Sequence, residues 1–145
     1  GGAARGALQS LLAIEPKRLI VANRTFSKAK LLASLLPQDN LIGMGFEQLL
    51  ENKIPFDLII NSTSTSLTGQ LPAVDDSVFE NCTSVYDMSY ADKPTVFLEH
   101  ASQLGIEQRF DGLGMLVGQA AESFYLWTGF RPNVTPVIKE LRSML

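Results

Sequence analysis

A short apolar run, Leu19–Ala22, ends in Asn23-Arg24-Thr25 and follows a glycine-rich segment, Gly1–Gly6, earlier in the chain. A short, continuous apolar run is typical of a strand buried on both faces of a parallel sheet. In dinucleotide-binding βαβ units, a glycine-rich turn opens the first helix, and the second strand ends beside the adenosine ribose about twenty residues later. The spacing therefore predicts such a unit, with the glycine pair approaching phosphate.

Arg24 stands where an NAD-binding unit usually carries Asp or Glu to accept hydrogen bonds from the ribose. A guanidinium is permanently charged and suits a 2′-phosphate better than a plain diol. Asn23 and Thr25 flank it, and Lys28 follows one turn into the next helix. These residues predict NADP rather than NAD; the alternative is a solvated strand end.

Short apolar runs alternate with segments of helical periodicity along the whole chain. The pattern predicts helices over 2–13, Lys28–Leu36 (capped by Ser27), Phe46–Glu51, Thr95–Leu104, Gly112–Thr128 and Val134–Leu145 (capped by Asn133), and strands over Leu19–Ala22, 41–44, Phe56–Asn61, Thr83–Met88 and Ile106–Phe110. This alternation indicates an α/β fold, a Rossmann-like doubly wound parallel sheet with C-terminal helices.

The glycine pair of such a unit should follow a strand, and the chain begins at the pair. We therefore expect a sheet that lacks its first strand, with Leu19–Ala22 and Phe56–Asn61 flanking the gap. Unpaired strand edges are costly to leave open or to bury. The chain of 145 residues alone is accordingly expected to be oligomeric, aggregated or partly unfolded.

Composition excludes several classes of site. A net charge of −3 gives no general attraction to nucleic acid, and no window is apolar enough to span a membrane. A single cysteine, Cys82, excludes an intrachain disulfide, and with a single histidine, His100, it excludes a metal site built from Cys and His. We expect a cytoplasmic protein, and we interpret Cys82, His100 and Trp127 as structural.

Three further segments carry polar or small residues where strands end or helices begin. The loop Asn61–Ser64 has hydroxyls that either contact a ligand or satisfy the turn, and Asp87 within Tyr86–Tyr90 is interpreted as structural. Gly112 and Gly114 are unfavourable at a helix start by about 1 kcal/mol each, which predicts close approach by a ring or a neighbouring helix. The last helix but one has apolar residues at helical spacing, namely Leu113, Leu116, Val117, Ala120, Ala121, Phe124 and Trp127.

Five segments in order resemble the cofactor-binding half of the shikimate dehydrogenase family, over essentially the whole chain: Gly1–Gly6, Asn23–Thr25, Ile60–Ser64, Tyr86–Tyr90 and Asp111–Ala121. The chain departs from the usual pattern of the family in two places. Only the second half of the glycine motif Gly-Ala-Gly-Gly-Ala-x-Arg is present. In the loop usually written Asn-Ala-Thr-Ser, Ser62 replaces Ala, and Ser66 stands where Gly is frequent.

The resemblance implies a role for each candidate residue. It places Gly1, Gly2 and Ala3 at the pyrophosphate, Asn23, Arg24, Thr25 and Lys28 at the 2′-phosphate, Thr63 and Ser64 along the cofactor, Met88, Gly112 and Met115 at the nicotinamide, and Tyr90 and Gln119 at the substrate. Residues 112–145 would form helices that return toward a substrate domain. The proton-transferring Lys–Asp pair belongs to that separate N-terminal domain, so this chain should carry no catalytic residue and no metal ligand.

The implied reaction is the NADP-dependent interconversion of 3-dehydroshikimate and shikimate in chorismate and aromatic amino-acid biosynthesis. A homodimer is possible, and the sequence does not decide the oligomeric state. Tyr90 and Gln119 suit a small polyhydroxylated carboxylate, which favours shikimate over the substrates of other amino-acid-dehydrogenase-like enzymes, such as methylenetetrahydrofolate dehydrogenase or glutamyl-tRNA reductase. A quinate/shikimate dehydrogenase is the alternative within the class. The non-enzymatic alternative is an isolated nucleotide-binding module. The chain alone is expected to have no dehydrogenase activity.

Overall fold

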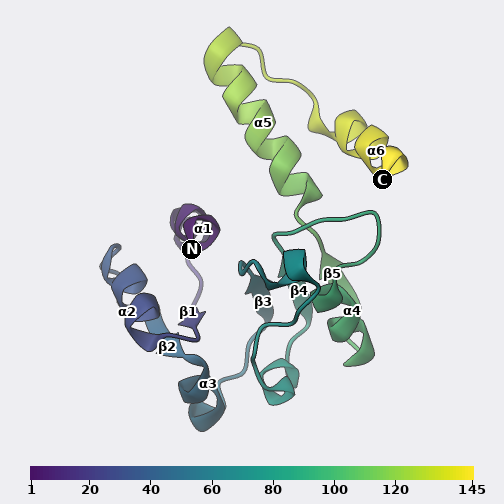
Figure 1. The fold of residues 1–145 in the computed structure, drawn as a ribbon. Coiled ribbons are helices and arrows are strands. Elements are labelled where there is room, and N and C mark those ends of the chain that lie inside the picture. The colour runs from purple at the N-terminus through teal and green to yellow at the C-terminus, as the bar shows by residue number, and fades with distance from the viewer. The chain divides into compact units, whose positions relative to one another are not determined.

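The computed structural model describes residues 1–145, except for the side chain of Leu67. Helices and parallel strands alternate along the chain, as Figure 1 shows. The helices are α1 Gly2–Ala13, α2 Phe26–Ser34, α3 Phe46–Asn52, α4 Val96–Gln103, α5 Leu113–Thr128 and α6 Val134–Met144; the strands are β1 Leu19–Asn23, β2 Leu41–Gly45, β3 Leu58–Asn61, β4 Ser84–Asp87 and β5 Gln108–Phe110; two short 3₁₀ helices, η1 and η2, span Thr65–Thr68 and Asp76–Phe79. The predicted α/β class with parallel strands is confirmed.

The chain divides into two compact units, Gly1–Asp57 with Pro72–Cys82, and Leu58–Leu71 with Thr83–Leu145. In the first unit β1 and β2 pair in parallel, with Leu19 opposite Leu41 and Asn23 opposite Gly45. Helix α2 packs closely on this sheet. A Cβ built on Gly43 would lie 2.6 Å from the carbonyl carbon of Ala29, so only glycine admits the helix at this distance.

Strand β1 is half-buried at every position, whereas the sequence predicted a buried strand. The reason lies in the pairing. β1 has only β2 as a partner in its two-stranded sheet, so its other edge is open within the unit. In the second unit β3 is likewise the end strand of its sheet.

The second unit contains the three-stranded parallel sheet β3–β4–β5, in which Asn61 lies opposite Asp87. Helix α4 packs against β4 and β5. The most deeply buried side chains of this unit include Val85 on the central strand, Phe97 on α4 and Leu113 at the start of α5. The carboxyl ends of all three strands therefore meet at one edge, where parallel sheets place their ligand-binding loops.

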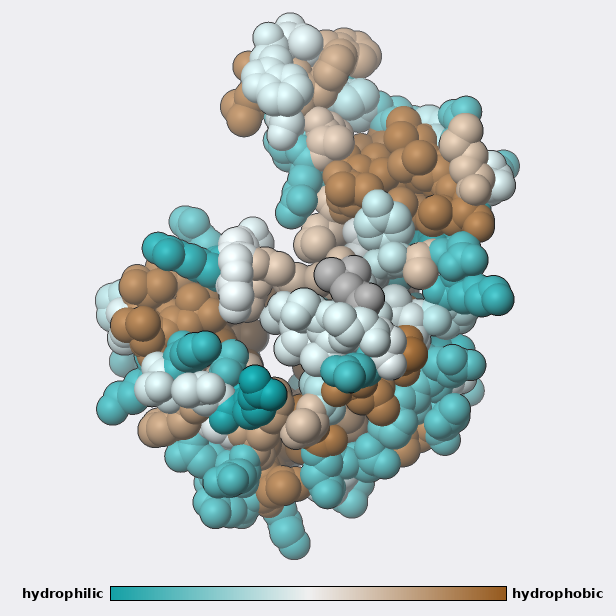
Figure 2. Space-filling model, in the orientation of Figure 1, coloured by the Kyte–Doolittle hydropathy of each residue, from teal (hydrophilic) through white to brown (hydrophobic). Residues whose placement is uncertain are grey.

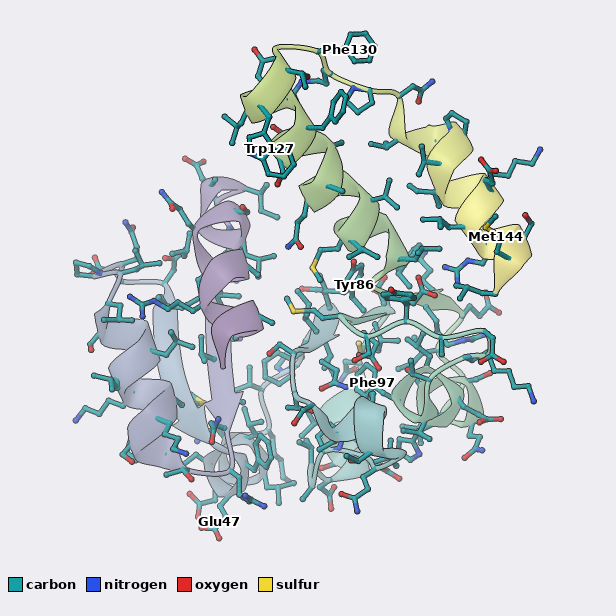
Figure 3. All side chains as sticks on the ribbon, turned by 45° about the horizontal axis from the view of Figure 1, so that its top comes forward. Glu47, Tyr86, Phe97, Trp127, Phe130 and Met144 are labelled. Carbon is teal, nitrogen blue, oxygen red and sulfur yellow. The ribbon has the colours of Figure 1, made fainter. Side chains whose placement is uncertain are left out.

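Only one face of α5 is buried. Leu113, Val117 and Ala121 are buried, whereas Leu116, Ala120, Phe124 and Trp127, which share the predicted apolar spacing, are exposed. Trp127 and Phe130 extend from the far end of the helix (Figure 3), and Trp127 is 81% exposed. Helix α6 buries no residue, and hydrophobic side chains gather at the surface over α5 and α6 (Figure 2).

Several element boundaries differ from the sequence-based expectation. Helix α2 begins at Phe26 with Thr25 as its N-cap, so the prediction of Ser27 as the cap is wrong. β3 begins at Leu58, because the chain is not yet paired at Phe56. The 3₁₀ helix η2 was not predicted; Asp75 caps it by accepting a hydrogen bond from the backbone of Ser77. The cap of α6 at Asn133 is confirmed.

Among the described residues, no helix is both long and apolar enough to cross a membrane.

Candidate functional site

The glycine pair lies at the first turn of α1. Gly1 is the N-cap position, and no side chain caps the helix there. A Cβ built on Gly1 or on Gly2 would meet no atom within 4 Å, so the backbone is open to an approaching group on this side. The first N–H groups of a helix, around Gly2 and Ala3, attract anions because they have no intrahelical acceptor. The local geometry is therefore compatible with a phosphate.

The Asn23–Thr25 turn connects β1 to α2. The side-chain Oδ1 of Asn23 accepts the backbone N–H of Thr25 at 2.8 Å, which fixes the turn directly after the strand. Arg24 and Lys28 are exposed, and in the part of the chain that the structure describes neither of them forms an ion pair. Both cations are thus available to an anionic ligand at the carboxyl end of β1.

In the second unit, the loop after β3 is organised by the buried amide of Asn61. Its Oδ1 accepts the backbone N–H of Thr63 at 3.1 Å and the Thr63 hydroxyl at 2.7 Å. Thr63 and Thr65 also share a hydrogen bond between their hydroxyls at 2.6 Å. The hydroxyl of Thr63 therefore stabilises the loop itself, while Ser64 at the tip is exposed.

Asp87, at the end of β4, is fully buried and holds two loops at once. Its Oδ2 accepts the hydroxyls of Ser66 at 2.7 Å and Thr95 at 2.6 Å. Its Oδ1 accepts the backbone N–H of Ser89 at 3.0 Å and the amide of Asn61 at 3.3 Å. Four donors compensate a buried carboxylate for the water it has lost. These contacts agree with the structural role expected for Asp87.

The reason for a glycine at position 112 is the backbone of Met88. A Cβ on Gly112 would lie 2.0 Å from the carbonyl oxygen of Met88. The N–H of Gly112 donates to the carbonyl of Ser89 at 3.0 Å, so the two segments are locked together. The sequence predicted close approach by a ring or a helix, but the neighbour in this structure is the turn after β4. A Cβ on Gly114 would meet nothing within 4 Å.

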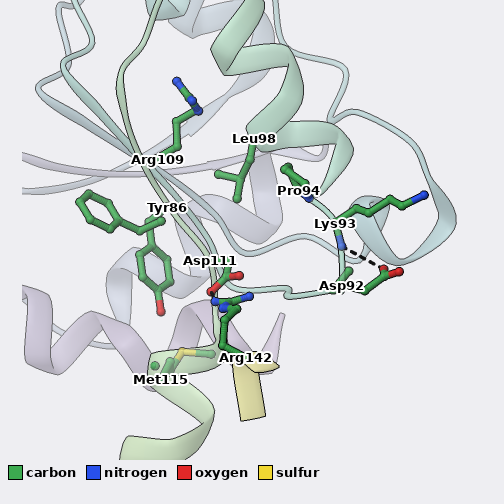
Figure 4. Close-up of a pocket in the computed structure, with 12 residues that line it drawn as sticks. Tyr86, Asp92, Lys93, Pro94, Leu98, Arg109, Asp111, Met115 and Arg142 are labelled. Atoms are coloured by element: carbon green, nitrogen blue, oxygen red, sulfur yellow. Dashed lines mark hydrogen bonds and ion pairs between the residues drawn. The ribbon is translucent and has the colours of Figure 1, made fainter. Parts of the chain in front are cut away.

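A cavity of about 700 Å³ opens beside the start of α5 (Figure 4). Its walls include Tyr86 of β4 and Met115 of α5, and an ion pair of 2.7 Å between Asp111 and Arg142 closes one side. Burial raises the pKa of Tyr86 above its ordinary 10.0, and the charge of Asp111 raises it further, while the backbone N–H of Met115 acts in the opposite direction. The phenol of Tyr86 is therefore neutral at physiological pH, and it lines the cavity as a group that can donate or accept a hydrogen bond.

The candidate residues of the second unit are only partly brought together. Met88 and Gly112 are in contact through their backbones, and Met115 lines the cavity. Tyr90 is 39% exposed and Gln119 is exposed on α5; no hydrogen bond between them is found among the described residues. No cluster of three or more His, Cys, Asp or Glu residues that could hold a metal ion occurs among the described residues.

Sequence reasoning did not single out Ser66 and Thr95 as the partners of Asp87, nor Asp111 and Arg142 as a pair. Thr95 carried a usable signal, because a threonine just before a helical segment is a cap, and its hydroxyl accepts the N–H of Leu98 at 3.3 Å. The Asp111–Arg142 pair joins residues far apart in the chain and leaves no local signal.

Comparison with known families gives two matches. Residues 1–85 match the model of shikimate / quinate 5-dehydrogenase, and residues 112–142 match the shikimate 5′-dehydrogenase C-terminal domain. Among curated proteins, "Shikimate dehydrogenase (NADP(+))" of Vibrio atlanticus is 51% identical over 100% of this chain and 52% of its own length. The protein of the same name from Cellvibrio japonicus is 50% identical, again over 100% of this chain and 52% of its own length. The chain thus spans about half the length of these relatives.

Solved structures agree with these matches. The Ael1 enzyme from Pseudomonas putida is similar with a TM-score of 0.89 and 40% identity, covering 97% of this chain and 51% of its own. Quinate dehydrogenase from Corynebacterium glutamicum in complex with NAD is similar with a TM-score of 0.81 and 26% identity, covering 99% and 52%. The family model covers more than half of the chain, and the folds correspond; the chain therefore belongs to the shikimate / quinate dehydrogenase family.

Proposed function

We propose that the protein carrying this chain is an NADP-dependent shikimate dehydrogenase, and that this chain is its cofactor-binding part. The observation that carries the cofactor assignment is the exposed, unpaired Arg24 at the carboxyl end of β1. It is supported by relatives named for NADP⁺ that are about half identical to the chain.

The residues present fit this cofactor. Arg24, with Asn23, Thr25 and Lys28, would bind the 2′-phosphate, since a guanidinium donates in pairs to phosphate oxygens. The open backbone at Gly1 and Gly2, together with the N–H of Ala3, would receive the pyrophosphate. Thr63, Ser64, Met88, Gly112 and Met115 would line the remainder of the cofactor; these five come from the loop after β3, the turn after β4 and the start of α5.

When bound, the cofactor supplies the hydride that reduces the 3-dehydroshikimate carbonyl. The residues of this chain hold and orient the reactants. Tyr90 and Gln119 would bind the substrate through its carboxylate and a hydroxyl, because a phenol and an amide can both donate to oxygen. The proton for the new hydroxyl would come from the Lys–Asp pair that the family resemblance places in the other domain. The chain alone should therefore not catalyse the reaction.

Steady-state assays of the full-length protein test the proposal. We expect NADP⁺-linked oxidation of shikimate, with much weaker turnover when NAD⁺ or quinate is substituted. An absence of NADP⁺-linked shikimate oxidation would refute it. Turnover by the purified 145-residue chain would contradict the division of labour between the two parts.

A quinate dehydrogenase is the second candidate, favoured by the structural similarity to the quinate enzyme of Corynebacterium glutamicum. That structure was determined with NAD, whereas Arg24 favours a phosphorylated ribose in this chain. The same assays separate the two, because the second candidate requires faster turnover of quinate than of shikimate.

A further inference from the structure

The hydroxyl of Ser66 occupies a central place in the second unit. It donates to Oδ2 of Asp87 at 2.7 Å and accepts from the side-chain amide of Asn61 at 3.0 Å. The same amide donates to Oδ1 of Asp87 at 3.3 Å, so the three side chains form a closed ring of hydrogen bonds. Asn61 is 4% exposed and Asp87 is fully buried, while Ser66 is half-buried, so two of the three members of the ring are shielded from water.

This ring fixes which way the amide of Asn61 faces. With its nitrogen held by Ser66 and Asp87, its oxygen must face Thr63, where it accepts both the backbone N–H and the hydroxyl. A flipped amide would place N–H groups against the Thr63 N–H, losing that bond, and would set its oxygen against Oδ1 of Asp87. The bond to Ser66 is the shorter of the two on the amide nitrogen, at 3.0 Å against 3.3 Å. Ser66 therefore shares with Asp87 the restraint on the amide nitrogen of Asn61.

The ring also connects two segments proposed to line the cofactor. Asp87 accepts the N–H of Ser89, and the backbone N–H of Met88 donates to the carbonyl of Asn61 at 3.0 Å. The loop that carries Thr63 and the turn that carries Met88 are thus held in register. Ser66 lies in η1, and its bond to Asp87 connects the loop after β3 to the end of β4.

We propose that Ser66 is a positioning residue that sets the affinity for NADP by holding Asn61, and through Asn61 the loop at Thr63, in the binding geometry. Ser66 makes no direct contact with the reacting atoms in this proposal. The inference rests on the proposed function, because it assumes that the Thr63 loop lines the cofactor.

The test compares Ser66→Ala and Ser66→Gly with Ser62→Ala in the full-length protein. Ser62→Ala removes the same hydroxyl from the same loop, and no hydrogen bond of the Ser62 side chain is found among the described residues. Both variants at Ser66 should raise the KM and the calorimetric Kd for NADP⁺ by about three- to tenfold, the loss expected for one net hydrogen bond. The kcat at saturating NADP⁺ should change less than about twofold, since the chemistry does not involve Ser66. Ser62→Ala should match the wild type.

The outcomes separate the two proposals. A wild-type protein that does not bind NADP⁺ in the calorimeter refutes the proposed function, and this inference with it. Normal binding by the wild type, with an unchanged Kd in both variants at Ser66, refutes this inference alone. A lower melting temperature with an unchanged Kd also refutes it, because Ser66 would then support the fold without positioning the cofactor loop.

Discussion

Gly112→Ala provides a sharp test of how the site is packed. The added Cβ would lie 2.0 Å from the carbonyl oxygen of Met88 and 2.6 Å from its carbon. Gly112 has φ −78°, which alanine adopts without strain, so the entire cost is steric. The opposing atoms belong to the backbone, which the Gly112–Ser89 hydrogen bond holds in place. We therefore expect a loss of about 3 kcal/mol in the free energy of unfolding, the upper part of the range for overpacking.

Gly114→Ala is the matched control, because it adds the same methyl group two positions further along the chain, in the first turn of α5. Nothing lies within 4 Å of a Cβ at Gly114, and alanine is favoured over glycine in a helix by at most about 1 kcal/mol, so this substitution in the first turn should be neutral or slightly stabilising. Urea titrations of the full-length protein, followed by circular dichroism, should show a lower midpoint for Gly112→Ala and no loss for Gly114→Ala. A Gly112→Ala protein as stable as the wild type would show that the Met88 turn is not held against α5 as described.

Other predictions follow from single contacts. Arg24→Ala should weaken NADP⁺ binding by about ten- to a hundredfold, the value of a hydrogen bond to a charged group, and leave NAD⁺ binding nearly unchanged. The control is Arg18→Ala, at an exposed arginine just before β1, which should change the affinity for neither cofactor. An equal loss of affinity for both cofactors would instead assign Arg24 a role in the fold. Burial, and then the carboxylate of Asp111, raise the pKa of Tyr86 above 10.0 in the folded state. The unfolded state therefore loses the phenol proton at a lower pH than the folded state does, and stability falls as the pH rises beyond 10.0. Tyr86→Phe should reduce that alkaline loss, measured as urea midpoints at about pH 8 and about pH 11; an identical loss in both proteins would contradict the shift. Thr95→Val removes the hydroxyl that donates to Asp87 at 2.6 Å and caps α4, and should lower the free energy of unfolding in urea by about 2–3 kcal/mol. A change below about 0.5 kcal/mol would show that neither contact stabilises the fold.

The order and type of the main elements could be predicted because each depends on local chemistry. β1 is a short apolar run, and α6 begins after Asn133, whose side chain accepts the N–H of Thr135 at 3.1 Å. Such signals lie within a few residues of the element they determine. The start of α2 was misplaced by two residues because Ser27 is an equally good cap by composition, whereas the chain turns earlier, where Asn23 holds the N–H of Thr25.

The burial of α5 could not be predicted from its spacing alone. Leu113 and Val117 are buried while Leu116 and Trp127 are exposed, although all four follow the helical period. Periodicity identifies an apolar stripe, but the width of the stripe that a helix buries depends on the elements packed against it. The same limit applies to the cavity beside Tyr86, whose Asp111–Arg142 wall depends on the position of α6.

The candidate site illustrates the same limit at the level of single hydrogen bonds. The sequence placed Asn61 and Asp87 at the ends of two strands, and the parallel pairing of β3 with β4 sets them opposite each other. Asp87 was interpreted as structural, but a pattern cannot show that four donors converge on its carboxylate. Because both loops depend on that one carboxylate, a change at Ser66 should reach Thr63 even though the two side chains share no hydrogen bond among those described. The variants at Ser66 therefore test whether a residue that stabilises these loops also positions the cofactor.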